Sequence, residues 1–86
     1  MHEFSLMADL MRKIEHVAAD NNAERVTRVR VWLGALSHIT PEHFREHFED
    51  GTRGTLAEGA ELEVETSDDE THPEAQQILL RSLDVA

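Results

Sequence analysis

The sequence predicts a small α+β domain in which two helices pack on one face of a three-stranded sheet. Three observations lead to this prediction: a length of 86 residues, which allows one small core; two segments with apolar residues at helical spacing; and three short segments typical of strands. Hydrophobic residues make up 40% of the chain, as in a folded globule rather than a disordered tail. We therefore expect residues 1–86 to form a single domain.

The first expected element is a helix over about residues 4–22. Apolar side chains recur there at intervals of three and four residues and form one stripe along the helix. The stripe consists of Phe4, Met7, Leu10, Met11, Ile14, Val17 and Ala18. Asn21 and Asn22 are suitable helix stops, because Asn tolerates the left-handed conformation.

A strand is expected next, over residues 25–34, because its side chains alternate in character. Thr27, Val29, Val31 and Leu33 would face one way, and Arg28, Arg30 and Trp32 the other. Thr40 and Pro41 then have the residue types of an N-cap and a first helical position. They predict a second helix that runs to about residue 50, with Phe44 and Phe48 as its core pair.

Two further strands are expected, over residues 60–66 and 78–85. In the first, Leu62 and Val64 point inward and three glutamates point outward; these are Glu61, Glu63 and Glu65. Three like charges on one strand repel each other, so we expect Arg28 and Arg30 on a neighbouring strand to pair with them. The last strand alternates poorly and its inward face stays unassigned. Residues 67–77, which are polar and contain Pro73, are expected to form a loop.

Charge and composition exclude several functions. Eighteen acidic against eight basic residues give a formal charge of −10, which argues against binding to nucleic acid or to an anionic membrane surface. The absence of cysteine excludes disulfides, thiolate zinc sites and cysteine nucleophiles. No apolar run has the length of a spanning helix or the pattern of a secretory signal. We expect a cytoplasmic protein.

Catalytic motifs are missing, so an enzyme is not expected. The sequence has no phosphate-binding loop and no nucleophile elbow. His43 and His47 are four residues apart, which places both imidazoles on one helix face where they could bind a divalent metal. We favour a polar helix flank for this pair, and a small zinc enzyme is the weakest hypothesis. His16, His38 and His72 are interpreted as ordinary polar residues.

The N-terminal sequence Met1-His2-Glu3 carries donors for a nitrogen chelate. The amine of Met1, the amide nitrogen and imidazole of His2 and the amide nitrogen of Glu3 can form adjoining chelate rings around one ion. Planar nitrogen coordination suits Ni(II) or Cu(II) rather than Zn(II). Cu(II) would bind such a set more tightly than Ni(II), so the choice of metal must come from availability or partners.

The start Met1-His2-Glu3-Phe4-Ser5-Leu6 resembles that of the HypA/HybF family, the nickel metallochaperones of hydrogenase and urease maturation. The similarity continues along the chain in the family's order. It covers Gly34-Ala35-Leu36-Ser37, Pro41-Glu42-His43-Phe44, the segment 54–62 (GTLAEGAEL) and the closing segment 80–85 (LRSLDV). Most of the chain is therefore covered by the resemblance.

The resemblance implies a nickel-binding domain of two helices and a three-stranded sheet. It implies that nickel is held at the N-terminus, with His2 as side-chain ligand and Glu3 beside it. It also implies delivery to a hydrogenase large subunit, that of a [NiFe] hydrogenase, with help from a maturation GTPase. We expect a monomer or weak homodimer.

One departure from the family concerns zinc. The family carries a zinc ribbon with two Cys-x-x-Cys pairs between its second and third strands, whereas this chain has the cysteine-free loop 67–77 there. The ribbon is therefore expected to be absent, and no structural zinc is expected. The leading hypothesis is a cytoplasmic nickel metallochaperone. The alternative is a HypA-like interaction module that has lost metal transfer and acts through its acidic surface.

Overall fold

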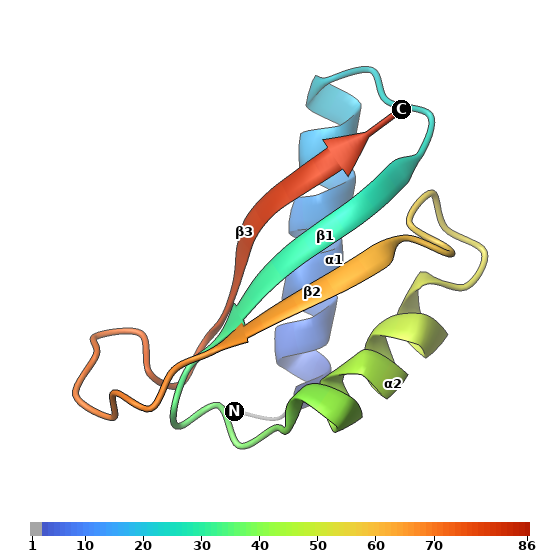
Figure 1. Ribbon diagram of the computed structural model, residues 1–86. Coiled ribbons are helices and arrows are strands. Elements are labelled where there is room, and N and C mark those ends of the chain that lie inside the picture. Colours follow the sequence, from blue (N-terminus) through green and yellow to red (C-terminus); the bar gives the residue numbers. More distant parts are fainter. Residues whose placement is uncertain (1–2) are drawn as a thin grey trace.

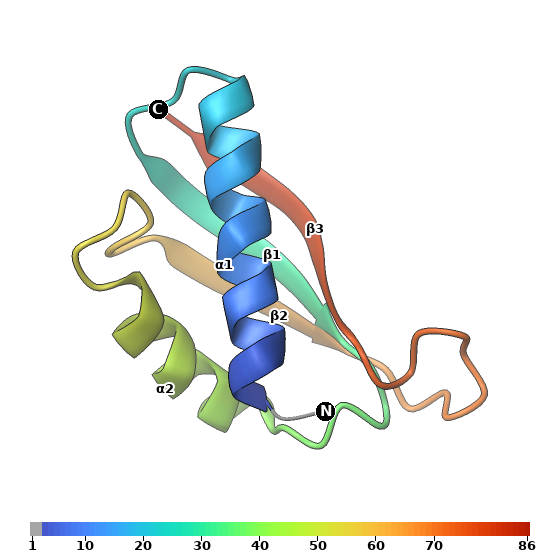
Figure 2. The same cartoon turned by 180° about the vertical axis from the view of Figure 1, so that it is seen from behind.

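The computed structural model describes the backbone of residues 3–86 and the side chains of residues 7–86. Its elements follow in the order α1 (Glu3–Asp20), β1 (Val26–Leu33), α2 (Pro41–Thr52), β2 (Glu61–Thr66) and β3 (Ile78–Val85). The strands form one mixed sheet in the order β2-β1-β3, in which β1 is parallel to β2 and antiparallel to β3. Both helices cover the same face of this sheet (Figures 1 and 2). The predicted fold class is thus confirmed.

Helix α1 buries one side and ends where the two asparagines predict. Met7, Leu10, Ile14 and Ala18 are buried, at the spacing of a single helical stripe. Asn22 follows the helix with φ of 53°, the left-handed conformation expected of a helix stop. The stripe is narrower than predicted, because Val17 is exposed and Met11 only partly buried. Phe4 lies outside the residues whose side chains are described.

Helix α2 is fixed at its start by a cap and along one side by two phenylalanines. The backbone N–H of His43 donates a hydrogen bond to the Thr40 hydroxyl at 3.1 Å, and Pro41 takes the first helical position. Phe44 and Phe48 are buried, with ring centroids 6.3 Å apart. The helix runs to Thr52, two residues beyond the predicted end.

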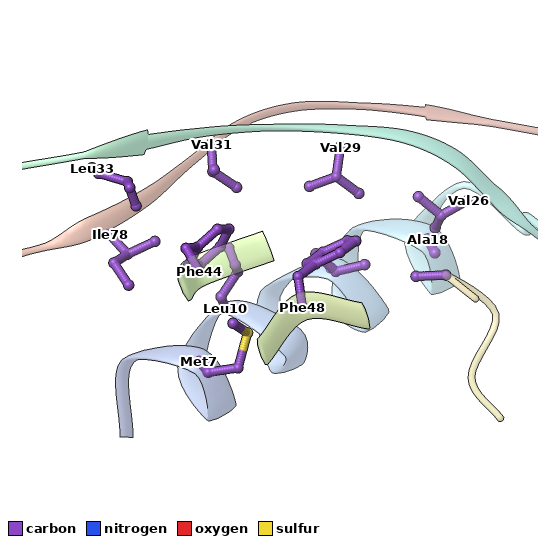
Figure 3. Packing of buried hydrophobic residues seen from close by; sticks show 12 residues of the cluster. Met7, Leu10, Ala18, Val26, Val29, Val31, Leu33, Phe44, Phe48 and Ile78 are labelled. Atoms are coloured by element: carbon purple, nitrogen blue, oxygen red, sulfur yellow. The ribbon is translucent and has the colours of Figure 1, made fainter. Parts of the chain in front are cut away.

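The core lies between the helices and the inner face of the sheet. In Figure 3 the side chains of Val29 and Val31 on β1 point toward Phe44, Phe48 and Leu10 on the helices. The inward direction predicted for Val29, Val31 and Leu33 is confirmed. Leu62 and Val64 of β2 also pack against this core, as expected.

Irregular pairing explains two places where alternation fails. Between β1 and β3 the pairing passes from Val26 with Val85 to Arg28 with Asp84 and skips Thr27. An extra residue of this kind shifts the phase of a strand, so Val26 is buried and Thr27 is exposed. The prediction that Thr27 shares a face with Val29, Val31 and Leu33 is therefore wrong.

The same kind of irregularity explains the poor alternation of β3. Arg30 pairs with Ser82 and Val31 pairs with Leu80, so Arg81 has no partner in the ladder. Ile78 and Leu80 pack inward before the irregularity, and Leu83 packs inward after it. Strand β3 therefore changes phase at Arg81, and a constant two-residue period could not assign its faces.

Residues 67–77 form the expected loop between β2 and β3, and they pack against the end of β1. The Leu36 N–H donates to the Ala75 carbonyl at 2.7 Å, and the Gly34 N–H donates to the Gln77 carbonyl at 3.0 Å. A Cβ atom on Gly34 would lie only 2.1 Å from the Ala75 oxygen, so the loop requires glycine there. Across residues 3–86, the length and apolar character needed to cross a membrane are found in neither helix.

Candidate metal-binding region

The ligands predicted at the N-terminus fall at the margin of the structure. Met1 and His2 lie outside the described residues, and Glu3 is the first residue of α1, with its side chain outside the description. Helices α1 and α2 begin at the same end of the molecule (Figure 1). The segment predicted to bind nickel therefore joins the fold at the end where α2 starts.

His43 and His47 form a pair on α2. Their Nε2 atoms are 3.1 Å apart and their ring centroids 4.5 Å apart, which confirms that the four-residue spacing places both imidazoles on one face. His43 is exposed and His47 partly buried. Two imidazole nitrogens thus approach each other at a surface that solvent can reach.

The pair lies on the side of α2 that faces α1. Residues 43, 47 and 51 form one ridge of the helix, because they are spaced by four. At the end of this ridge, a Cβ atom added to Gly51 would lie 3.8 Å from Cγ of Met7, a residue of α1. The opposite flank faces β2, where Arg45 donates a hydrogen bond to the Leu62 carbonyl at 3.1 Å. The imidazoles therefore flank the contact between the two helices.

The other described histidines lie on other parts of the chain. His16 lies 3.4 Å from Asp20 on α1, and His38 has φ of 60° in the connection before α2. Nδ1 of His72 accepts a hydrogen bond from the Glu74 N–H at 2.9 Å. Within the described part of the chain, no three His, Asp or Glu side chains gather closely enough to hold a metal ion. The prediction that these three histidines have ordinary polar roles is not tested further.

A charged ladder covers much of the outer face of the sheet. Arg28 lies opposite Glu61 and Arg30 opposite Glu63, and the closest nitrogen–oxygen distance is 2.7 Å in each pair. The hydrogen bond and charge of Glu61, joined by the charge of Glu63, raise the pKa of Arg28. The predicted pairing of these strands is confirmed, and it is parallel.

Two acidic residues of this face differ from the prediction. Glu65 lies opposite Trp32 rather than an arginine, and the nearest cation is Arg81 of β3, at 4.0 Å. Asp84, which the sequence did not single out, approaches Arg30 at 3.7 Å from the other neighbouring strand. Asp84 was missed because β3 changes phase at Arg81. The alternation of residue types along β3 therefore did not indicate which face of the sheet Asp84 lies on.

Trp32 lies at one end of the outer face of the sheet. Its side chain is buried although it points away from the helices. Its ring lies 4.9 Å from that of His72 in the loop, and the Arg81 guanidinium lies 5.5 Å from the indole centroid. Sequence alternation placed Trp32 on this face correctly. The side chains that cover it, His72 in the loop and Arg81 on β3, are distant in sequence.

Comparison with known proteins gives consistent matches. A family model described as "Hydrogenase/urease nickel incorporation, metallochaperone, hypA" matches residues 1–74. The hydrogenase maturation factor HypA of Methylocella silvestris is 42% identical over 65 residues, which cover 76% of this chain and 58% of the relative. That of Aquifex aeolicus is 45% identical over 65 residues, which cover 76% of this chain and 56% of the relative. The chain thus spans less than two thirds of the length of these curated relatives.

Solved structures support the fold. The solution structure of the Ni metallochaperone HypA from Helicobacter pylori matches with a TM-score of 0.80 and 21% identity, over 99% of this chain and 97% of that chain. A second solution structure, of a HypA protein, matches with a TM-score of 0.74 and 22% identity. At this level of identity, the likeness shows the shared arrangement of helices and strands.

Proposed function

Because this chain belongs to the HypA family of hydrogenase and urease nickel-incorporation metallochaperones, we propose that it carries Ni(II) and hands it over during maturation of a nickel enzyme. The observation that carries this proposal is the family match over residues 1–74. Its relatives are named hydrogenase maturation factors, which favours a [NiFe] hydrogenase as the recipient. The chain would act as a carrier and not as an enzyme.

The cargo ion would be held by Met1, His2 and Glu3. The donors are the Met1 amine, the His2 amide nitrogen and imidazole, and the Glu3 amide nitrogen, a set that suits planar Ni(II). A carrier must release its ion, so we expect this terminal ligand set to leave the ion open to ligand exchange with a recipient. A fully enclosed site would release its ion too slowly for transfer.

The partners would belong to the maturation machinery: a GTPase and the large subunit of the hydrogenase. The acidic surface of the chain, with a formal charge of −10, would favour docking to basic surfaces and oppose binding to nucleic acid or anionic membranes. We place this exchange in the cytoplasm, with the carrier as a monomer or weak homodimer.

We also propose that residues 1–86 act as one nickel-binding domain without a zinc ribbon. The loop 67–77 takes the ribbon's place between β2 and β3 and contains no cysteine. Contacts with the end of β1 and the residues after it support this proposal, since Gly34 and Leu36 donate hydrogen bonds to the loop. Chelator treatment should therefore leave the far-UV spectrum and the melting temperature unchanged.

Titration of Ni(II) into untagged protein, compared with protein carrying extra residues before Met1, tests the proposed site. The extension removes the terminal amine from its chelate ring, so affinity should fall as strongly as in His2→Ala. Glu3→Gln keeps the amide nitrogen and should do less harm. Binding should weaken steeply below about pH 6.5, where an imidazole with the ordinary pKa becomes cationic.

Circular dichroism on the same variants serves as the control for folding. If the extended protein binds nickel as tightly as the native one, the terminal site is wrong. If neither binds nickel, the carrier function itself fails for this chain.

A further inference from the structure

We propose that the outer edge of β2 is a docking site for an extended segment of a partner protein, in which basic and apolar side chains alternate. The segment would join the sheet as a fourth strand beside β2. That this partner belongs to the maturation machinery rests on the proposed function. The docking site itself rests on the strand order, the backbone directions and the charges of β2.

Alternate residues of β2 direct their backbone groups away from β1. In a parallel pair, every second residue bonds to the neighbouring strand, and the backbone groups of the residues between point to the other side. The Ser67 N–H donates to the carbonyl of the last residue of β1 at 3.1 Å, so the odd-numbered positions face β1. The Leu62 carbonyl instead accepts a hydrogen bond from Arg45 of α2 at 3.1 Å. Leu62, Val64 and Thr66 therefore present their backbone groups at the edge of the sheet.

The edge of β2 is regular, whereas the edge of β3 is not. Pairing between β1 and β2 runs without a shift, from Arg28 opposite Glu61 to Leu33 opposite Thr66. Strand β3, at the other edge of the sheet, changes phase at Arg81. Such a bulge bends an edge strand and hinders pairing with a further strand. Strand β2 is therefore the better template for an added strand.

Helix α2 supplies a surface on which an added strand could pack. It lies beyond β2, on the side of the sheet away from β1, in both views of the fold (Figures 1 and 2). A hollow of about 470 Å³ opens between the two elements, lined by Arg45, Phe48 and Glu49 of α2 and by residues 59–63. The inward side chains of an added strand would lie there beside Leu62. Because Phe48 and Leu62 belong to or pack against the core, this position suits apolar side chains.

The outward side chains of an added strand would lie beside Glu61, Glu63 and Glu65. Side chains opposite each other on one face of neighbouring strands interact, and opposite charges attract there. Strand β1 shows this preference on the other side of β2, where Arg28 and Arg30 contact Glu61 and Glu63. The three glutamate side chains stay between 53% and 69% exposed, so a second row of basic side chains can still reach them.

A second copy of this chain would fit the edge less well. Pairing of β2 with the β2 strand of a second copy would bring three glutamates from each chain onto one face, and like charges opposite each other are destabilising. The formal charge of −10 on each chain adds to this repulsion. The charge pattern therefore favours a different protein with basic residues in an extended segment.

Arg45 shows that a hydrogen-bond donor can reach this edge from outside the sheet. Its guanidinium comes from an exposed position of α2 and donates to the Leu62 carbonyl, as the backbone N–H of an added strand would do. An added strand would replace this bond with its own and extend the pairing to Val64 and Thr66.

Amide hydrogen exchange, followed by NMR without nickel, tests the site on the native chain. The probe is the peptide acetyl-Arg-Val-Arg-Val-Arg-Val-amide. Exchange of the Val64 and Thr66 amides should slow by about tenfold at a peptide concentration ten times the dissociation constant, because only the unbound fraction then exchanges. The amides of Glu63 and Glu65, which face β1, should change much less. This alternation along β2 is specific to strand addition.

Matched controls separate strand pairing from attraction by charge. A peptide with three arginines followed by three valines has the same charge without the alternation, and it should not slow exchange at Val64 and Thr66. Glu65→Gln should weaken binding of the alternating peptide by about two- to fivefold, the size of one exposed ion pair. Glu15→Gln, on the exposed side of α1, removes the same charge and should leave binding unchanged. Far-UV spectra should be the same for both variants.

The proposal is overturned if the alternating peptide does not bind, or if it binds without slowing exchange at Val64 and Thr66. Slowed exchange within residues 78–85 instead would assign docking to β3, and equal effects of the two peptides would reduce the interaction to charge alone; both results contradict the proposal. None of these outcomes bears on nickel binding, which the titration of untagged protein measures. The two proposals therefore fail separately.

Discussion

The two faces of the sheet are built on different physical principles. The inner face is apolar and covered by α1 and α2, and Val29, Val31 and Leu33 of β1 are almost completely buried there. The outer face carries the ladder of Arg28 and Arg30 against acidic neighbours, and these side chains keep contact with water. Strand β1 thus contributes to both faces through alternate residues.

The difference between the two faces shows which one stabilises the fold and which one arranges the charged side chains. Burial of apolar area stabilises the fold in proportion to the area removed from water, whereas exposed ion pairs contribute little because solvent and salt screen them. The inner face should therefore determine whether the chain folds. The outer face mainly prevents repulsion in a chain with a formal charge of −10.

The largest expected effect comes from the inner face. Phe44→Ala should lower the free energy of unfolding by about 3–5 kcal/mol, because the ring is fully buried and its loss leaves a cavity. Val17→Ala on the exposed side of α1 is the control and should have a small effect. Urea unfolding followed by far-UV circular dichroism measures both. Similar losses in the two variants would contradict the assignment of the core.

The next effect concerns the end of the outer face that the loop 67–77 covers. Gly34→Ala should lower stability by about 1–3 kcal/mol, because the added methyl would overlap the Ala75 carbonyl. Displacement of the loop should also expose Trp32 and shift its fluorescence to longer wavelength.

Gly51→Ala is the matched glycine control. Its added Cβ would make an ordinary 3.8 Å contact with Met7, and alanine is the better helix former, so stability should stay unchanged or rise slightly. Unshifted Trp32 emission in Gly34→Ala would mean that the loop does not depend on the close approach at Gly34.

The sequence predicted features that depend on nearby residues better than features that depend on residues distant in the chain. Local patterns predicted the two helices, the Thr40 cap and the partner strands, because each depends on nearby residues or on a plain charge pattern. The faces of β3 could not be predicted, since the change of phase at Arg81 arises from pairing with β1. The cover over Trp32 likewise comes from His72, forty residues away in sequence.

For the candidate site, spacing predicted that His43 and His47 share a face of α2, but not that their ridge faces α1. That information requires the packing of two helices, which a single sequence does not contain. The N-terminal ligands Met1, His2 and Glu3 stay a prediction. Their test is chemical, by nickel binding.

A smaller effect is expected from the ladder. Changing Arg28 and Arg30 together to glutamate should reduce the melting temperature more than changing both to glutamine, because the two new glutamates would lie beside Glu61, Glu63 and Asp84. The difference should shrink as salt is added, since exposed charges are screened. Thermal unfolding at low and high salt measures it. Equal melting temperatures for the two double variants at low salt would show that the ladder has no electrostatic role.

The smallest expected effect lies in the loop itself. The Thr71 hydroxyl and backbone N–H both donate to the Asp69 carboxylate, and the hydroxyl bond is the largest of the causes that lower the pKa of Asp69. A carboxyl whose pKa is lower in the folded state stabilises the fold above its unfolded pKa of about 3.9, and this contribution is lost as pH falls through the folded value. Thr71→Val should raise the pKa of Asp69 toward the ordinary value but not fully, because the N–H remains. NMR titration of the Asp69 carboxyl carbon measures the change, and Thr71→Ser, which keeps a hydroxyl, should preserve the low pKa. An unchanged pKa in Thr71→Val would show that the hydroxyl does not lower the pKa of Asp69.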